Sequence, residues 1–211
     1  IVTGHMDTEG GKMLTSPPVA YVTKGTPGAG HFNKFQSRVS QLPEFGGELP
    51  VAAMAEDILT PGEGQIKAMF TIAGNPVLSG TNGNQMDEAF EQLDYMVAFD
   101  FYINETTRHA NIILPPPSPL EHDHYDFAFF RLAIRDVTRF NEEIFAKSDE
   151  ALHDWEIYNA VAAKISERKN VEFKPMPDPK HLIDSELKNG LYGDNSEHKL
   201  SLETILQHHP G

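Results

Sequence analysis

Two polar residues stand at the ends of apolar segments that predict strands, and both could contact a ligand. Asn75 lies in the turn Gly74-Asn75-Pro76, and its amide offers both a donor and an acceptor. Asp100 ends the predicted strand 95–100, and its carboxylate could accept two N–H groups of a base such as guanine. Ligands of open parallel sheets bind beyond the carboxyl ends of the strands. Two alternatives remain: Asn75 as a turn residue that bonds its own backbone, and Asp100 as a strand-end cap.

A third polar residue, Asp154, begins the clearest helical pattern of the chain. The helix predicted over 154–168 has its apolar residues on one face, with Arg168 and Lys169 at its negative end. Asp154 is placed to cap this helix, which needs no ligand. A helix start also attracts polar ligand groups, so the two roles are compatible.

The most titratable stretch of the sequence is His122-Asp123-His124. Two histidines at i, i+2 on a strand point the same way and could chelate a metal, which gives one hypothesis, a histidine-dependent metalloenzyme. A third ligand of defined spacing is missing, and Pro115-Pro116-Pro117 just before it indicates a surface loop. We therefore predict no metal ligands here and a polar contact instead, with His122 donating to an anionic or carbonyl group.

No residue of the chain is predicted to be catalytic. The pair Gly28 and Gly30 lacks the third glycine of a dinucleotide fingerprint. No serine is flanked by the glycines of a nucleophile elbow. Cysteine is absent, which excludes disulfides, thiolate zinc sites, iron–sulfur ligation and a cysteine nucleophile within these 211 residues.

The net charge of the chain limits the classes of partner that it is expected to bind. A formal net charge of −14 argues against a nucleic-acid-coating surface and against binding to anionic membranes. No apolar run reaches the ~18 residues of a membrane span. Because the chain starts at Ile1 rather than Met, we expect it to be a piece of a longer protein.

The spacing of apolar residues predicts the elements that must hold the polar residues in place. Strands are expected over 66–73, 95–100 and 111–114, and helices begin near Pro50 and near Met86. This alternation predicts an α/β fold, a mostly parallel sheet covered by helices in a Rossmann-like, three-layer arrangement. A short turn or helix is expected at 105–109.

Less regular structure is predicted for the rest of the chain. Residues 1–49 form a long irregular segment, with a short strand at 19–22, that would pack on a missing domain. Residues 50–170 form the α/β domain, which includes an edge strand at 129–137. Residues 171–211 are loop-like over 173–200 and end in a short helix capped by Ser201.

Three stretches in fixed order resemble the molybdopterin oxidoreductase family, the enzymes similar to formate dehydrogenases, nitrate reductases and dimethyl sulfoxide reductase. They are the turn Gly74-Asn75-Pro76, the run from Asp100 through Glu105-Thr106 to Leu114-Pro115, and the segment 118–126. Segments near both ends of the chain also resemble the family, so the resemblance covers nearly the whole sequence.

The resemblance implies a cofactor-binding role. In that family, one α/β domain of this kind holds the guanosine end of a molybdopterin guanine dinucleotide that chelates molybdenum or tungsten. The residues expected to contact the nucleotide are Asn75, Phe99, Asp100, His122 and Asp154. Asp100 or Asp154 would pair with guanine nitrogens, and Asn75 would hold the ribose or phosphate region. Glu105 and Thr106 match the family's Glu-Thr pair and would fix the turn before the third strand.

The resemblance also implies which features belong to parts of the enzyme outside this chain. An iron–sulfur cluster would belong to a missing N-terminal part, and a C-terminal domain would follow Gly211. The partners are then other domains of the same enzyme and an unidentified redox partner, in the bacterial cytoplasm or periplasm. The fragment is expected to be inactive alone, with no cofactor bound in isolation. The competing hypothesis is a stand-alone acidic binding or scaffold domain that has lost the cofactor.

Overall fold

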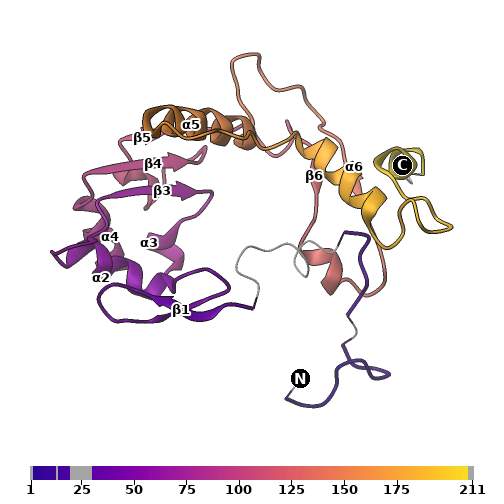
Figure 1. The fold of residues 1–211 in the computed structure, drawn as a ribbon, viewed down its shortest axis with the longest axis horizontal. Coiled ribbons are helices and arrows are strands. Elements are labelled where there is room, and N and C mark those ends of the chain that lie inside the picture. Colours follow the sequence, from indigo (N-terminus) through magenta and orange to yellow (C-terminus); the bar gives the residue numbers. More distant parts are fainter. Residues whose placement is uncertain (1, 13, 20–29, 209–211) are drawn as a thin grey trace. The chain divides into compact units, whose positions relative to one another are not determined.

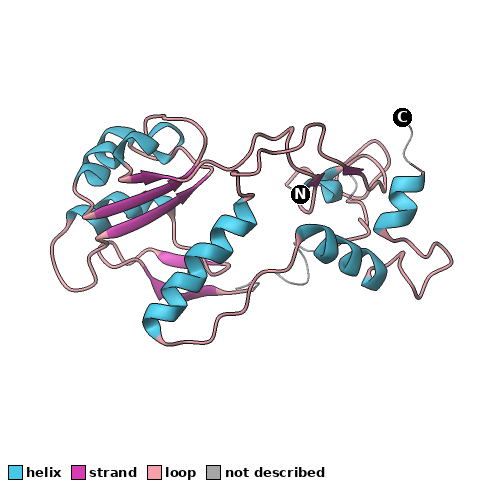
Figure 2. Cartoon of the chain, turned by 90° about the horizontal axis from the view of Figure 1, so that it is seen from above, coloured by secondary structure: helices cyan, strands magenta, loops and turns pink. Residues whose placement is uncertain are grey.

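The computed structural model describes residues 2–12, 14–19 and 30–208, and the chain forms two compact units. Unit 1 combines residues 1–26, 119–146 and 169–211, and unit 2 combines residues 27–118 and 147–168. Figure 1 labels their elements and Figure 2 shows the chain from above. We describe each unit by itself.

Unit 2 is built on a parallel three-stranded sheet. Its strands are β3 (Ala68–Ile72), β4 (Tyr95–Phe99) and β5 (Ile112–Ile113), in the order β3-β4-β5. Ala68 pairs with Tyr95 and Ile72 with Phe99, so β3 and β4 end together. These strands confirm the three predicted from apolar runs, each somewhat shorter than expected.

Helices lie against both faces of the central strand β4. On one face, Met96 packs on α2 (Met54–Leu59) and α4 (Gly83–Glu91), in a cluster with Ile58, Met86 and Phe90. On the other face, Val97 and Phe99 pack on Ile157 of α5 (Asp154–Lys169). The short elements η1 (Val51–Ala53), α3 (Pro76–Ser79) and η2 (Thr107–His109) complete this unit's helices. Side chains alternate across a strand, which is why one strand serves both helical layers.

A hairpin in unit 2 corrects the expectation that residues 1–49 are irregular. β1 (Phe32–Gln36) and β2 (Pro43–Phe45) pair antiparallel. All five side chains of β1 are exposed, so the hairpin has no apolar alternation that could have predicted it. It is held by polar contacts instead: the fully buried Glu44 carboxylate accepts the N–H groups of Lys34 and Gly47.

Unit 1 has a smaller core. The two-residue strands β6 (His124–Tyr125) and β7 (Phe140–Asn141) pair antiparallel, and α6 (Pro179–Asn189) and α7 (Leu202–Gln207) accompany them. Tyr125, Phe140, Ile183, Leu187 and Ile205 form one buried cluster. As predicted, Ser201 caps α7, in a capping box with Thr204.

Two expectations for unit 1 are wrong. Residues 129–137 are not a strand: η3 (Phe129–Leu132) begins there because the Asp126 carboxylate accepts the N–H groups of Ala128 and Phe129. Residues 173–200 are not all loop, since α6 lies within them, started by the Asp178 cap and Pro179. The predicted strand at 19–22 lies outside the described residues except for Val19.

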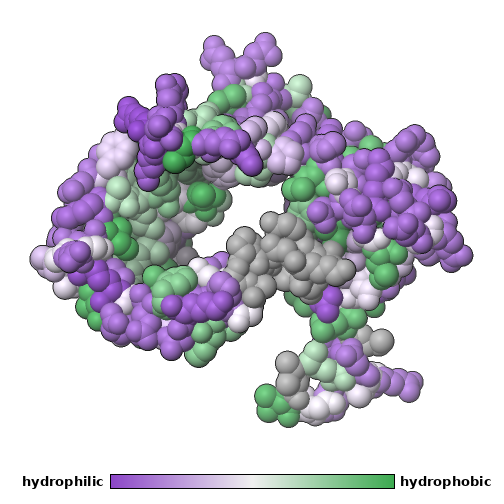
Figure 3. All heavy atoms as spheres, viewed as in Figure 1, coloured by the Kyte–Doolittle hydropathy of each residue, from purple (hydrophilic) through white to green (hydrophobic). Residues whose placement is uncertain are grey.

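Within residues 2–12, 14–19 and 30–208, the fold is therefore mixed α/β, with one parallel three-stranded sheet and two small antiparallel pairs. The domain division 1–49, 50–170 and 171–211 stays a prediction. Hydrophilic residues cover most of the surface visible in Figure 3, as the net charge suggests. None of the described helices is long and apolar enough to cross a bilayer.

Candidate functional site

The tip of β3 places Asn75 at the carboxyl edge of the sheet. The Ala73 N–H donates to the Phe99 carbonyl at 2.9 Å, which continues the pairing with β4 by one residue. Ala73 has φ of 46°, a left-handed conformation that is uncommon for a residue with a side chain. Asn75 then begins α3, and its carbonyl accepts the Ser79 N–H at 2.9 Å. This strained corner is a feature that the sequence did not indicate.

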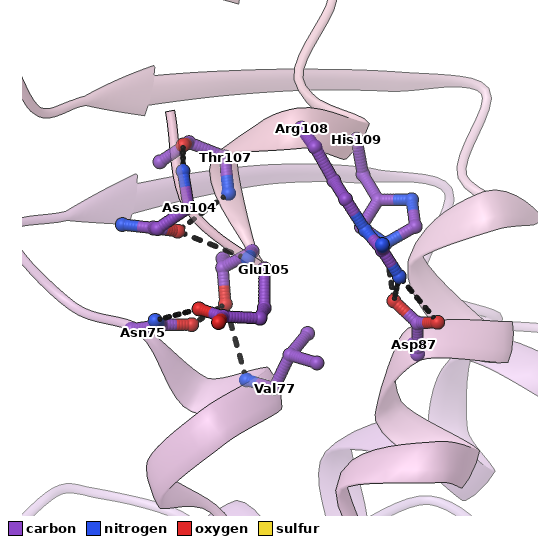
Figure 4. A network of polar contacts seen from close by, with 9 residues as sticks. Asn75, Val77, Asp87, Asn104, Glu105, Thr107, Arg108 and His109 are labelled. Carbon is purple, nitrogen blue, oxygen red and sulfur yellow. Dashed lines mark hydrogen bonds and ion pairs between the residues drawn. The ribbon is translucent and has the colours of Figure 1, made fainter. Parts of the chain in front are cut away.

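The Asn75 side chain bonds the turn that follows β4, not its own backbone. Its Nδ2 donates to Glu105 Oε2 at 2.7 Å, and its Oδ1 accepts the Thr106 hydroxyl at 2.7 Å. Figure 4 shows these contacts joining the two strand ends. The alternative that Asn75 only stabilises its own turn is thus wrong. One hydrogen of the Nδ2 group remains beyond the Glu105 contact.

Thr106 is the buried centre of this contact. Its side chain is fully buried, and its Oγ1 also accepts the Val77 N–H of α3 at 3.1 Å. One hydroxyl therefore fixes both the Asn75 amide and the start of α3. Burial makes the loss of such a bond costly, because its partners would be left without water. Glu105 and Thr106 thus fix Asn75 as well as the turn to which the sequence assigned them.

Asp100 has the local bonds of a strand-end cap. Its Oδ1 accepts the Tyr102 N–H at 3.1 Å and its Oδ2 accepts Asn104 Nδ2 at 3.2 Å. Asn104 Oδ1 in turn accepts the N–H groups of Thr106 and Thr107, at 3.0 and 2.9 Å. Each carboxylate oxygen can still accept a further hydrogen bond. Asp100 is therefore held in one orientation with acceptor capacity left.

The Glu105 carboxylate keeps its negative charge at this edge of the sheet. The Asn75 hydrogen bond, followed by that of its own backbone N–H, lowers the pKa of Glu105. The exposed Glu105 carboxylate and the half-buried Asp100 carboxylate lie on the same turn, residues 100–105. This edge can accept N–H and O–H donors from a ligand.

An ion cluster braces the same turn from α4. The Asp87 carboxylate contacts Arg108 Nη2 at 2.5 Å and His109 Nε2 at 2.6 Å, as Figure 4 shows. The Arg108 hydrogen bond, then that of His109, lowers the pKa of Asp87. Arg108 is thereby neutralised within the protein and is poorly placed to attract an anionic ligand.

Asp154 is the first residue of α5, not its cap. His153 precedes the helix: its carbonyl accepts the Ile157 N–H at 3.0 Å, and its own N–H donates to Glu156 Oε2 at 2.7 Å. The Glu156 carboxylate thus satisfies the backbone N–H of the residue that precedes the helix, as the N3 side chain of a capping box does, and Asp154 lies exposed in the first turn. Burial, and then the charge of Asp154, raises the pKa of Tyr158 one turn later.

Phe99 links α5 to the strand tips. Its ring lies 5.1 Å from that of Tyr158, edge to face, and 6.0 Å from that of Phe70. The side chain is 4% exposed, so it packs between sheet and helix. The turn 104–106 thus connects Asn75 with Asp100, and the Phe99 and Tyr158 rings connect β4 with α5. Asp154 begins α5, one turn before Tyr158.

His122 belongs to unit 1, where its Nδ1 lies 2.8 Å from the carbonyl of Asp123. Its neighbour His124 is exposed in β6. Among the residues that the structure describes, no three histidine, aspartate or glutamate side chains gather as metal ligands would. The predicted role of His122 in nucleotide binding stays a prediction, as do those of the other four residues.

Comparison with known proteins identifies relatives of this chain. The family model described as molybdopterin oxidoreductase matches residues 18–164, well over half of the sequence. The chain is 30% identical over 117 residues to the assimilatory nitrate reductase catalytic subunit of Bacillus subtilis, covering 55% of this chain and 16% of that protein.

Two further relatives are similar at a greater distance. The F420-dependent formate dehydrogenase 1 subunit alpha of Methanococcus maripaludis is 26% identical over 117 residues, 56% of this chain and 17% of its own length. The dimethyl sulfoxide/trimethylamine N-oxide reductase of Rhodobacter capsulatus is 26% identical over 134 residues, 57% of this chain and 16% of its own length. The aligned part thus spans about a sixth of each relative, 16–17%.

Proposed function

The chain belongs to the molybdopterin oxidoreductase family, and on this premise we propose that it holds the guanosine end of a molybdopterin guanine dinucleotide within a larger redox enzyme. The observation that carries the proposal is the joined edge of unit 2, where Asn75, Glu105 and Thr106 connect the tips of β3 and β4. The helices on both faces of β4 support a Rossmann-like, three-layer arrangement for this unit.

The donors and acceptors at this edge fit a guanosine. Guanine presents N–H groups along one side, and a ribose presents hydroxyl groups. Carboxylate oxygens of Asp100 and Asp154 can accept from both, and the remaining Nδ2 hydrogen of Asn75 can donate to a ribose oxygen. The Arg108 guanidinium beside this turn is engaged by Asp87 and is poorly placed to bind phosphate groups. The chemistry of the edge therefore suits the nucleoside end of the dinucleotide.

We assign the residues different roles toward the nucleotide. Asp100 or Asp154 pairs with guanine nitrogens, and Asn75 holds the ribose or phosphate region. Phe99 contributes by packing, since its ring is buried against Tyr158. The predicted role of His122, donation to an anionic or carbonyl group, concerns a residue of unit 1 and stays a prediction. Glu105 and Thr106 position Asn75.

When bound, the pterin-chelated molybdenum or tungsten supplies the electron transfer, and the protein binds, orients and tunes it. The residues of this chain bind and orient the nucleotide. We propose that the chain is inactive alone, because no group in the edge site serves as a nucleophile or a proton shuttle. An iron–sulfur cluster, the substrate site and the redox partner then belong to other parts of the enzyme.

Asp100→Asn in the full-length protein tests the proposal. The substitution keeps the shape and one acceptor but removes the charge that pairs with guanine N–H groups. Charge-assisted hydrogen bonds contribute about 1.5–3 kcal/mol, so guanine nucleotide per protein should fall about tenfold or more at limiting cofactor. Acid release of the nucleotide and metal analysis measure this content.

Asp94→Asn is the matched control, because Asp94 lies at the opposite, amino end of β4. It should leave the guanine and metal contents unchanged. Equal contents in both variants and the wild type, with melting temperatures unchanged, would contradict the proposal. A full-length protein that never contains a guanine nucleotide would instead favour the acidic scaffold.

A further inference from the structure

A groove in unit 1 gathers basic side chains although the chain as a whole is acidic. It has a volume of about 740 Å³ and is lined by Arg135, Arg139, His198 and His208, with no carboxylate among its lining residues. The whole chain has 31 aspartates and glutamates against 17 lysines and arginines. The groove is therefore a positively charged region on an acidic chain. Its arginines attract anions, whereas the carboxylates of the rest of the chain repel them.

The two arginines of this groove are free to bind a ligand. Both are exposed, and neither forms an ion pair within the described parts of the chain. A guanidinium presents its N–H groups in a planar fork that matches the oxygens of a phosphate or carboxylate. Arg135 and Arg139 stand four residues apart on one irregular segment, and both line the groove.

The segment that carries these arginines is anchored between them. The Asp136 carboxylate accepts the Ser16 N–H at 2.7 Å and the Tyr192 hydroxyl at 3.3 Å. The Thr138 hydroxyl lies 2.8 Å from that of Tyr125, whose ring belongs to the core of unit 1. Because these bonds hold the backbone, a ligand would meet arginines whose attachment points are already in place.

Two histidines also line the groove. His208 Nδ1 donates to the Thr204 carbonyl at 2.8 Å, which turns Nε2 away from its own helix. The His198 ring packs edge to face on Tyr192, with centroids 5.6 Å apart. Two acids lie close by: Glu197 is 3.9 Å from His198, and Asp136 lines an adjoining hollow and accepts a hydrogen bond from Tyr192.

The floor of the groove is apolar. Phe130, Val137, Leu200 and Ile205 line it, and Ile205 belongs to the buried core. A bare inorganic anion would leave this floor uncovered, whereas a ligand with a flat apolar body would cover it. The volume lies within the range of about 300–1,000 Å³ that is typical of sites for small organic ligands.

We propose that this groove binds an organic phosphate with a flat apolar body, of the nucleoside monophosphate class. The phosphate lies between Arg135 and Arg139, and the base and sugar cover Phe130, Val137 and Leu200. The groove shares no residue with the edge site of unit 2, so this inference does not depend on the proposed function.

Calorimetric titration of the full-length protein with AMP, adenosine and inorganic phosphate tests this proposal. AMP should bind more tightly than either of its halves. Loss of one charge-assisted contact costs about tenfold in affinity, so Arg135→Gln or Arg139→Gln should weaken AMP binding about tenfold and the double variant about a hundredfold. Arg131→Gln is the matched control: it removes the same charge from η3, outside the lining, and should bind like the wild type.

Two outcomes would overturn the proposal. One is unchanged AMP affinity in the double variant, and the other is adenosine binding as tightly as AMP. Melting temperatures should equal that of the wild type in the Arg135 and Arg139 variants, since both side chains are exposed. Guanine nucleotide content separates the two sources of phosphate: content equal to the wild type in the double variant assigns the groove to a free nucleotide, and a parallel loss assigns it to the phosphates of the enzyme's own cofactor. The Asp100→Asn variant, by contrast, should keep its AMP affinity.

Discussion

The two units gather functional side chains in opposite ways. Unit 2 places acceptors at one edge because parallel strands end together, and a few buried bonds between the strand tips suffice to fix them. Unit 1 is assembled from three separate segments and places its basic side chains on a loop, anchored by side-chain bonds to Ser16, Tyr192 and Tyr125. Sheet geometry therefore produces the acidic edge, and loop anchoring produces the basic groove.

The largest effect on stability is expected when one core side chain is removed from each unit. Phe90→Ala should destabilise unit 2 by about 3–5 kcal/mol and Leu187→Ala should destabilise unit 1 by about 2–5 kcal/mol, because both residues are buried and leave a cavity. Hydrogen exchange read by segment should show faster exchange in β3 and β4 for the first variant and in α6 and α7 for the second.

The exposed Leu191 supplies the control for these core variants. Its side chain is 66% exposed, so Leu191→Ala should leave exchange in both units unchanged. Faster exchange throughout the chain in both core variants would show that the units unfold as one, and the comparison between them would no longer hold.

A smaller effect is expected from the bond that joins the strand tips. Thr106→Val keeps the shape of the buried side chain but leaves the Asn75 Oδ1 and the Val77 N–H without their partner. The cost should be about 2–3 kcal/mol, from the penalty for unsatisfied buried polar groups. Urea unfolding measures it, and guanine nucleotide content should fall with it because Asn75 loses its orientation.

Thr81→Val is the control for this variant, since Thr81 is exposed in the loop before α4. Its stability should stay near that of the wild type. If the Thr106→Val protein kept the stability and the nucleotide content of the wild type, the buried hydroxyl would not be needed to form the edge site.

The smallest effect concerns the Asp87 cluster and depends on pH. Arg108 and then His109 lower the pKa of Asp87 below the value of about 3.9 expected in the unfolded chain. The carboxylate therefore stabilises the fold above that pH, and this contribution is lost as the pH falls through the folded-state pKa. Asp87→Asn should be less stable than the wild type at pH 7, with the difference shrinking below about pH 4.

Melting curves across this pH range measure the effect, with Glu88→Gln as control on the exposed side of the same helix. A constant difference between Asp87→Asn and the wild type from pH 7 to pH 3 would show that ionisation of Asp87 is not its cause. The stability of unit 1 should not change with the Asp87→Asn substitution at any pH in this range, in contrast to that of unit 2.

The sequence predicted unit 2 better than unit 1 for a physical reason. The three strands follow mostly apolar runs, 66–73, 95–100 and 111–114, and a run of this kind predicts a strand even though only β4 is buried along most of its length. The hairpin of β1 and β2 has exposed side chains and a buried glutamate, and the segment 129–137 is shaped by the Asp126 carboxylate. Local polar bonds of this kind leave no periodic pattern in the sequence.

By itself, the sequence determined the α/β class, the strand ends that carry Asn75 and Asp100, and the family to which the chain belongs. Only the tertiary structure decided which groups meet: that Asn75 bonds Glu105 and Thr106, that Glu156 accepts the His153 N–H at the start of α5, and that two arginines and two histidines share one groove. Periodicity reflects which residues are buried, whereas partners across about 30 residues or more depend on the path of the chain between them.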